Sequence, residues 1–159
     1  MGLDINVVDE SGDSLFHAYI GSYSYYSRFR RTLQEFIKGG KTAEDLAVEQ
    51  NTAMLCELFP EDHEHLNRYV SQLQTGRVVP PHPRYRENKH NGTLQMLLDH
   101  SDCDGEFNSA QCKRIATLLR CFRVSYKEKY PGRLAETYQA FYDACITAGK
   151  DKNNKLIYH

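Results

Sequence analysis

The sequence contains no tryptophan, no long apolar segment and no excess of charge of either sign. No apolar stretch approaches the roughly 18 residues of a membrane-spanning helix, so we expect no spanning segment. Twenty Lys and Arg residues stand against twenty-one Asp and Glu residues, which gives a net charge of -1. Because non-specific nucleic-acid binding depends on a basic surface, this balance predicts no broad nucleic-acid binding.

The five cysteines are odd in number and include no Cys-x-x-Cys pair. Free thiols of this kind are typical of proteins in a reducing compartment. The amino-terminal residues meet acidic side chains before any long apolar run develops, so they lack the basic and apolar regions of a signal peptide. These observations predict a cytoplasmic protein.

The 159 residues, 40% of them hydrophobic and 26% charged, have the composition of an ordinary globular domain. A chain of this length buries roughly 70% of the surface that its unfolded state exposes, so it can fold without disulfides or a structural metal. We therefore predict a single domain over residues 1–159, in which any metal ion would serve function.

Two short segments of β-branched and apolar residues, over 3–8 and 15–20, flank a cluster of turn-forming residues and predict a β-hairpin. A further apolar stretch over 156–158 is predicted to add a strand beside it. Apolar residues at helical spacing predict five or six helices, over residues 23–38, 42–59, 60–74, 93–98, 109–127 and 131–148. We predict an α+β fold with a small sheet packed by these helices, and a proline-rich basic loop over residues 77–92.

Residues 98–111 contain closely spaced acidic side chains and match the calcium-binding loop of an EF-hand in part. Gly105 occupies the sixth position, where that loop turns sharply, and Phe107 the apolar eighth. The segment differs from the pattern at its first position, His100, and at its twelfth, Gln111, where Ca²⁺ favours carboxylates. The residues predicted to ligate a metal are His100, Asp102, Asp104, Glu106 (through its carbonyl) and Asn108.

Three interpretations of this acidic loop stay open. In the first, it is a tight structural turn in which Asn108 caps the next helix and Gln111 reciprocates. In the second, it holds a divalent cation such as Ca²⁺, Mn²⁺ or Zn²⁺. In the third, His100, Asp102 and Asp104 act as general acid and base in a metal-assisted phosphoester hydrolysis.

Three sequence segments occur together in this chain: Met-Gly-Leu-Asp at 1–4, Ile-Gly-Ser-Tyr-Ser-Tyr at 20–25 leading to Arg-Phe-Arg at 28–30, and His-Ser-Asp-Cys-Asp-Gly at 100–105. In these segments the sequence resembles a group of small uncharacterised proteins from bacteria and their phages, a group with no assigned activity. The resemblance implies a small cytoplasmic protein of bacterial or phage origin, and an anti-defence or host-takeover role is the setting it suggests. It implies no mechanism.

Tyrosine and arginine concentrate where the second predicted strand leads into the first predicted helix. The backbone N–H groups that open a helix attract anions, and hydroxyl and guanidinium groups lie close to them in the sequence. The residues predicted to bind an anionic ligand are His17, Ser22, Tyr23, Tyr25, Arg28 and Arg30. In the alternative, structural interpretation, Tyr26 and Phe29 are core residues, Ser22 or Ser24 caps the helix, and the arginines are solvated.

Our leading interpretation is a non-catalytic cytoplasmic binding protein with a small anionic-ligand pocket near the acidic loop. Its partner would be a small anion or a host protein. The alternatives are a metal-assisted phosphoester hydrolase and a weak Ca²⁺-binding interaction module.

Overall fold

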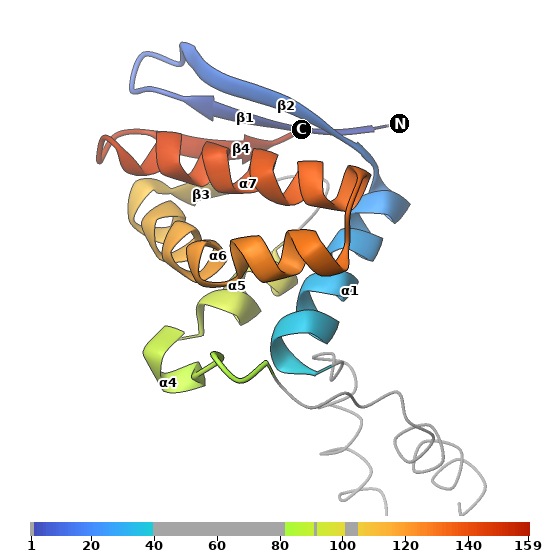
Figure 1. Ribbon diagram of the computed structural model, residues 1–159. Coiled ribbons are helices and arrows are strands. Elements are labelled where there is room, and N and C mark those ends of the chain that lie inside the picture. Colours follow the sequence, from blue (N-terminus) through green and yellow to red (C-terminus); the bar gives the residue numbers. More distant parts are fainter. Residues whose placement is uncertain (1, 40–81, 91, 101–104) are drawn as a thin grey trace, which may run out of the picture. The chain divides into compact units, whose positions relative to one another are not determined.

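The computed structural model of the protein describes residues 2–39, 82–90, 92–100 and 105–159 (Figure 1). The chain divides into two compact units, residues 1–30 with 86–159 and residues 31–85. The first unit contains every described strand. The prediction of a single domain over residues 1–159 stays a prediction.

An antiparallel sheet of four strands, in the order β2-β1-β4-β3, forms one layer of the first unit. Its strands are β1 (Gly2–Val8), β2 (Ser14–Ser22), β3 (Gly105–Asn108) and β4 (Lys155–Tyr158). The predicted hairpin of β1 and β2 is confirmed, and the predicted carboxy-terminal strand lies beside β1. Strand β3 is not among the predicted strands; it pairs with β4 at one edge of the sheet.

Side-chain alternation in β1 explains why this segment is a strand. Leu3, Ile5 and Val7 are fully buried on one face, whereas the residues between them are half-buried on the other. The hairpin turn is closed by Asp9, whose carboxylate accepts hydrogen bonds of 2.9 Å from the backbone N–H groups of Ser11 and Asp13. An Asx turn of this kind fixes the chain reversal between the two strands.

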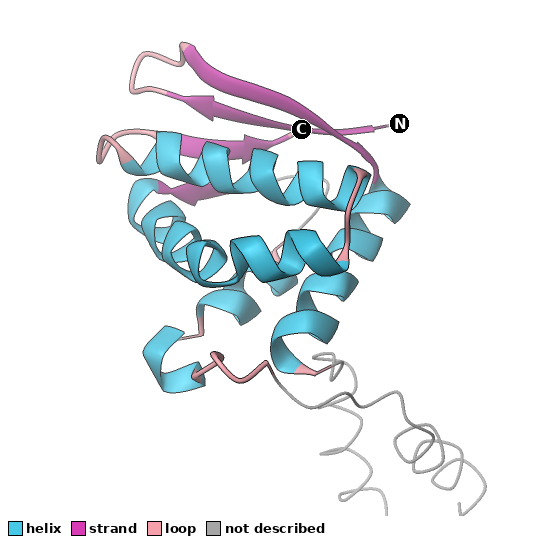
Figure 2. Ribbon diagram, in the orientation of Figure 1, coloured by secondary structure: helices cyan, strands magenta, loops and turns pink. Residues whose placement is uncertain are grey.

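Helices α6 (Ser109–Lys129) and α7 (Arg133–Gly149) cover one face of the sheet, α7 against β1, β2 and β4, and α6 against β3 and β4 (Figure 2). The other described helices are α1 (Tyr23–Lys38), α4 (Glu87–His90) and α5 (Thr93–Asp99). The α+β fold is therefore confirmed. Four of the predicted helices correspond to α1, α5, α6 and α7, and those over 42–59 and 60–74 lie outside the described residues.

The predicted basic loop over residues 77–92 lies partly outside the described residues. Within it, residues 82–86 are not helical, but Glu87–His90 forms the four-residue helix α4. The described residues contain no helix that has both the length and the apolar character to cross a membrane.

Tyrosine contributes much of the aromatic core of the first unit. The ring of Tyr26 from α1 lies 6.0 Å from that of Phe141 on α7 and 5.8 Å from that of Tyr158 on β4, measured between centroids. A hydrogen bond of 2.9 Å joins the hydroxyls of Tyr26 and Tyr158, and the buried Tyr138 hydroxyl donates to the Leu119 carbonyl. Burial is the main cause that raises the pKa of Tyr158 well above its usual value. The tyrosines fill core volume while each of these hydroxyls keeps a partner.

Candidate functional site

The junction between β2 and α1, where the sequence predicts an anion site, is capped from within the chain. Ser22 ends β2 and Tyr23 begins α1. The Ser22 hydroxyl accepts a hydrogen bond of 3.2 Å from the Tyr25 backbone N–H and lies 2.9 Å from the Ser24 hydroxyl. Ser22 is therefore the N-cap of α1, as the structural interpretation expects.

The cation at this junction is Arg133 on α7, which is not among the site residues predicted from the sequence. The guanidinium of Arg133 lies over the Tyr25 ring, 3.9 Å from its centroid, and donates a hydrogen bond of 3.4 Å to the Ile20 carbonyl. The Tyr25 hydroxyl lies 3.0 Å from the Thr137 hydroxyl, also on α7. Gly21 has φ +130°, a backbone conformation that residues with a Cβ rarely adopt, and a Cβ there would also meet the Arg133 guanidinium, so this position favours glycine. Tyr25 is thus held by α7.

Arg30 joins α1 to the residues that follow α5. Its Nη1 donates hydrogen bonds of 3.1 Å to the Leu98 carbonyl and 2.8 Å to the His100 carbonyl. These are carbonyls at a helix carboxyl end, which lack partners within their own helix. The Arg30 guanidinium also lies 4.8 Å from the centroid of the Tyr26 ring. Arg28, by contrast, is exposed.

The six residues predicted to bind an anion do not converge on one point. Tyr25 faces α7, Arg30 faces the end of α5, and His17 lies on β2, where its Nε2 pairs with the Asp4 carboxylate at 3.0 Å. Tyr23 is half-buried at the start of α1. Anion binding at the junction stays a prediction.

In the described part of the acidic loop, the polar groups of His100 and Glu106 are bonded to other groups of the chain. His100 Nε2 lies 3.1 Å from the Glu106 carbonyl oxygen, and its ring stacks on Tyr158 with centroids 4.7 Å apart. The Glu106 carboxylate pairs with Lys155 Nζ at 3.1 Å. Both the carbonyl and the side chain of Glu106 therefore have partners within the chain.

The beginning of α6 carries the predicted cap. The Asn108 side-chain oxygen accepts a hydrogen bond of 2.8 Å from the Gln111 backbone N–H, and the Gln111 side-chain oxygen accepts one of 2.9 Å from the Asn108 N–H. This reciprocal pair is a capping box, as the first interpretation of the loop expects. Two of the predicted ligands, Asp102 and Asp104, lie outside the described residues. Over the residues that are described, no three His, Cys, Asp or Glu side chains gather in a way that could hold a metal ion.

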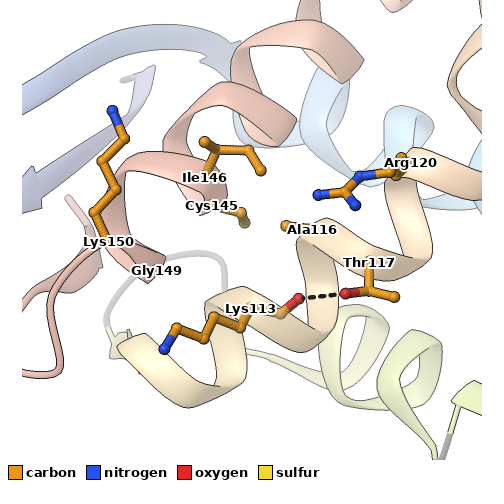
Figure 3. Close-up of a pocket in the computed structure, with 8 residues that line it drawn as sticks. All are labelled: Lys113, Ala116, Thr117, Arg120, Cys145, Ile146, Gly149 and Lys150. Atoms are coloured by element: carbon orange, nitrogen blue, oxygen red, sulfur yellow. Dashed lines mark hydrogen bonds between the residues drawn. The ribbon is translucent and has the colours of Figure 1, made fainter.

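A surface hollow that the sequence analysis did not predict lies between α6 and α7 (Figure 3). Its volume is about 330 Å³, and the residues that line it are Lys113, Ala116, Thr117, Arg120, Cys145, Ile146, Gly149 and Lys150. Three of these eight residues are cations and none is acidic. A second hollow of about 570 Å³ lies further along the same pair of helices, lined by Arg123, Val124, Lys127, Glu128 and Gln139.

We refer to the two hollows together as the basic groove, and the cations that line them are Lys113, Arg120, Arg123, Lys127 and Lys150. Helix α6 carries six basic residues and one acidic residue in all. Arg120 Nε donates a hydrogen bond of 3.4 Å to the Tyr142 hydroxyl, and this contact raises the pKa of the guanidinium. Cys145, on the floor of the first hollow, is buried, and its hydrogen bond with Cys112 together with burial raises the pKa of its thiol. In the first hollow the floor is therefore uncharged and the rim is positive, whereas Glu128 adds one negative charge to the second.

A signal for this groove is present in the sequence. Lys113, Arg120 and Lys127 are seven residues apart, which is close to two turns of an α-helix. Residues at this interval share a helix face, so the pattern places three cations on one side of α6. The apolar periodicity of the same helix identified only its buried face.

Comparison of the chain with protein-family models, with curated proteins and with solved structures finds no match.

Proposed function

We propose that the protein is a non-catalytic binding protein whose basic groove holds an acidic segment of another protein. The observation that carries this proposal is the seven-residue spacing of Lys113, Arg120 and Lys127 along the two hollows. At the rise of an α-helix, neighbouring cations of this set are about 10.5 Å apart, and the three together extend over about 21 Å. A partner with several carboxylates in a row complements such a line of charge.

The arrangement of the cations favours an elongated partner over one compact anion. In Figure 3 the Arg120 guanidinium reaches toward Ile146 on the facing helix, while the ammonium groups of Lys113 and Lys150 point away from one another. A single small anion could not bind all three groups at once. Several separate negative charges along one chain can.

The uncharged part of the groove favours an acidic peptide over a nucleic acid. Ala116, Cys145 and Ile146 form an apolar floor in the first hollow, and Val124, beside the second, is 66% exposed. A peptide can place apolar side chains on these residues between its carboxylates. Neither set of lining residues in the described chain includes an aromatic ring on which a base would stack.

The resemblance to small bacterial and phage proteins suggests that the acidic partner is a protein of the host. In that setting the chain acts in the cytoplasm by covering a surface of its target, in anti-defence or host takeover. Such an action requires affinity and no catalytic group.

The proposal is tested by the fluorescence anisotropy of a labelled poly-glutamate peptide at physiological salt. The wild-type protein is expected to bind it, and the double variant Lys113→Gln with Arg120→Gln to bind about tenfold more weakly. This factor corresponds to a loss of about 1.4 kcal/mol from two exposed ion pairs. Both residues are exposed, so circular dichroism should show an unchanged fold.

The matched control is Arg84→Gln with Lys152→Gln, which removes the same charge from exposed residues outside both the groove and the predicted anion site. This variant should bind the peptide as the wild type does. An equal or larger loss in the control than in the groove variant would contradict the proposal. Equal or tighter binding of a labelled single-stranded oligonucleotide would contradict the choice of an acidic protein as partner.

A further inference from the structure

Tyr142 on α7 contacts one arginine of each hollow of the basic groove. Its hydroxyl accepts the hydrogen bond of 3.4 Å from Arg120 Nε, and the central guanidinium carbon of Arg123 lies 4.9 Å from the centroid of its ring. Arg120 lines the first hollow and Arg123 the second. Tyr142 is not among the lining residues of either hollow and is only 8% exposed. One buried side chain therefore holds a cation of each hollow.

The positions of the two arginines in the sequence explain what this contact does. Arg120 and Arg123 are three residues apart on α6, an interval that makes two side chains neighbours on a helix surface. Like charges on neighbouring positions repel, and long side chains without a fixed partner sample many rotamers. Tyr142 gives each guanidinium its own contact from the facing helix, so the rotamers of both arginines are restricted.

The two contacts are made by different parts of Tyr142. Arg120 is bonded to the hydroxyl at the end of the side chain, whereas Arg123 lies over the ring. The two guanidinium groups therefore occupy separate positions, one in each hollow. Because Nε of Arg120 is bonded to Tyr142, its two Nη groups remain for a partner, and such a pair of donors matches the two oxygens of a carboxylate.

We propose that Tyr142 is a positioning residue of the basic groove, which presents Arg120 and Arg123 to two separate carboxylates and so selects a run of carboxylates over a single phosphate group. This inference rests on the proposed function and adds to it the residue that sets its specificity. A phosphate group carries about two negative charges at one point, so it is bound best by cations that converge there. Carboxylates on successive side chains carry the same charge at separate points.

Positioning of this kind has a predictable effect on affinity. A flexible side chain that is ordered before binding avoids an ordering cost, which corresponds to roughly two- to tenfold in affinity for each side chain. Tyr142→Phe keeps the ring that contacts Arg123 and removes the hydroxyl bonded to Arg120, so it should weaken poly-glutamate binding about threefold. Tyr142→Leu removes both contacts and should weaken binding about tenfold, although neither variant changes the charge of the groove.

A double-mutant cycle separates positioning from packing. In the Arg120→Gln background the Nε donor is absent, so Tyr142→Phe should cause no further loss of poly-glutamate binding. A tyrosine that acted only through packing would lower the affinity by the same factor in both backgrounds. That result would overturn the proposal, even if the wild-type protein bound the peptide.

NMR of the free protein tests the contact without any peptide. The signal of the Arg120 Nε–H group is identified by its loss in Arg120→Gln, and its exchange with water should be slow in the wild type and fast in Tyr142→Phe. Tyr138→Phe is the matched control, because it removes from the same helix a hydroxyl that donates to the Leu119 carbonyl, and it should leave the signal unchanged. Fast exchange in the wild type would overturn the proposal. Slow exchange in a wild-type protein that does not bind poly-glutamate would instead contradict the proposed function, and with it the role of Tyr142 in binding.

A pair of labelled peptides tests the specificity. One is a glutamate peptide, and the other has the same length and nearly the same charge, with one phosphoserine in place of each pair of glutamates. The wild type should bind the glutamate peptide more tightly, and Tyr142→Leu should lose this preference because its two guanidinium groups can converge on one phosphate. Tyr142→Phe, which retains the ring, keeps the cycle and the NMR test valid if Tyr142→Leu does not fold. Equal or tighter binding of the phosphopeptide by the wild type, or an unchanged preference in folded Tyr142→Leu, would overturn the proposal.

Discussion

The β2–α1 junction and the basic groove are built from the same kinds of side chain and use them in opposite ways. At the junction, Arg133 lies on Tyr25 and bonds the Ile20 carbonyl, and Arg30 bonds two carbonyls after α5. In the groove, Lys113 and Arg120 are exposed over an uncharged floor. The arginines of the junction thus bond backbone carbonyls within the chain, whereas in the groove Arg120 contacts only the Tyr142 hydroxyl among the hydrogen bonds described and stays exposed.

This difference has a measurable form. A substitution at the junction should change the free energy of unfolding, because it removes contacts within the chain. A substitution in the groove should change binding and leave stability within about 0.5 kcal/mol, as is usual for exposed positions.

Tyr26→Ala should destabilise the protein most. Tyr26 is fully buried among the rings of Phe29, Phe141 and Tyr158, so truncation leaves a large cavity. We expect a loss of about 3–5 kcal/mol in urea unfolding followed by circular dichroism. Tyr26→Phe keeps the ring and removes only the hydroxyl contact with Tyr158, which should cost about 1 kcal/mol. Equal losses in the two variants would mean that ring packing is not the main contribution.

Arg30→Ala should lower stability by about 1.5–3 kcal/mol, because two carbonyl oxygens lose a charged donor. Arg28→Ala is the matched comparison, since Arg28 is exposed two residues earlier on the same helix, and it should stay within about 0.5 kcal/mol of the wild type. Both residues belong to the anion site that the sequence predicts. If Arg28→Ala were the more destabilising variant, the assignment of Arg30 to a structural role would fail.

Local patterns predicted the parts of the fold that depend on neighbours in the chain. The β-branched and apolar residues over 3–8, next to a cluster of turn formers, predicted the first strand, and Asn108 with Gln111 predicted the amino-terminal cap of α6. In each case the partners that decide the structure lie within a few residues of one another, so their spacing in the sequence carries the geometry.

The features that the sequence did not predict depend on distant partners. β3 has only four residues, Gly-Glu-Phe-Asn, which lack the β-branched side chains typical of strands, and it is held by pairing with β4 far along the chain. Tyr25 and Thr137, joined at the junction, are 112 residues apart. The residue type alone could not show that the ring and hydroxyl of Tyr25 already have partners on α7. The basic groove differs from these features, because the seven-residue interval between Lys113 and Arg120 is local and can be recognised in the sequence.

Asn108→Ala tests whether a polar side chain of the acidic loop stabilises the fold or binds a ligand. It should destabilise the protein less than Tyr26→Ala or Arg30→Ala. Its side chain accepts the Gln111 N–H, so its removal should cost about 1 kcal/mol, the usual loss for a helix cap, in urea unfolding. Asn108→Asp keeps an oxygen acceptor at this position and should be close to the wild type. Repeating the series with added Ca²⁺ separates the two uses of the residue. If Ca²⁺ stabilised the wild type and Asn108→Asp but not Asn108→Ala, the side chain would act as a cation ligand, and the loop would join the groove as a binding region.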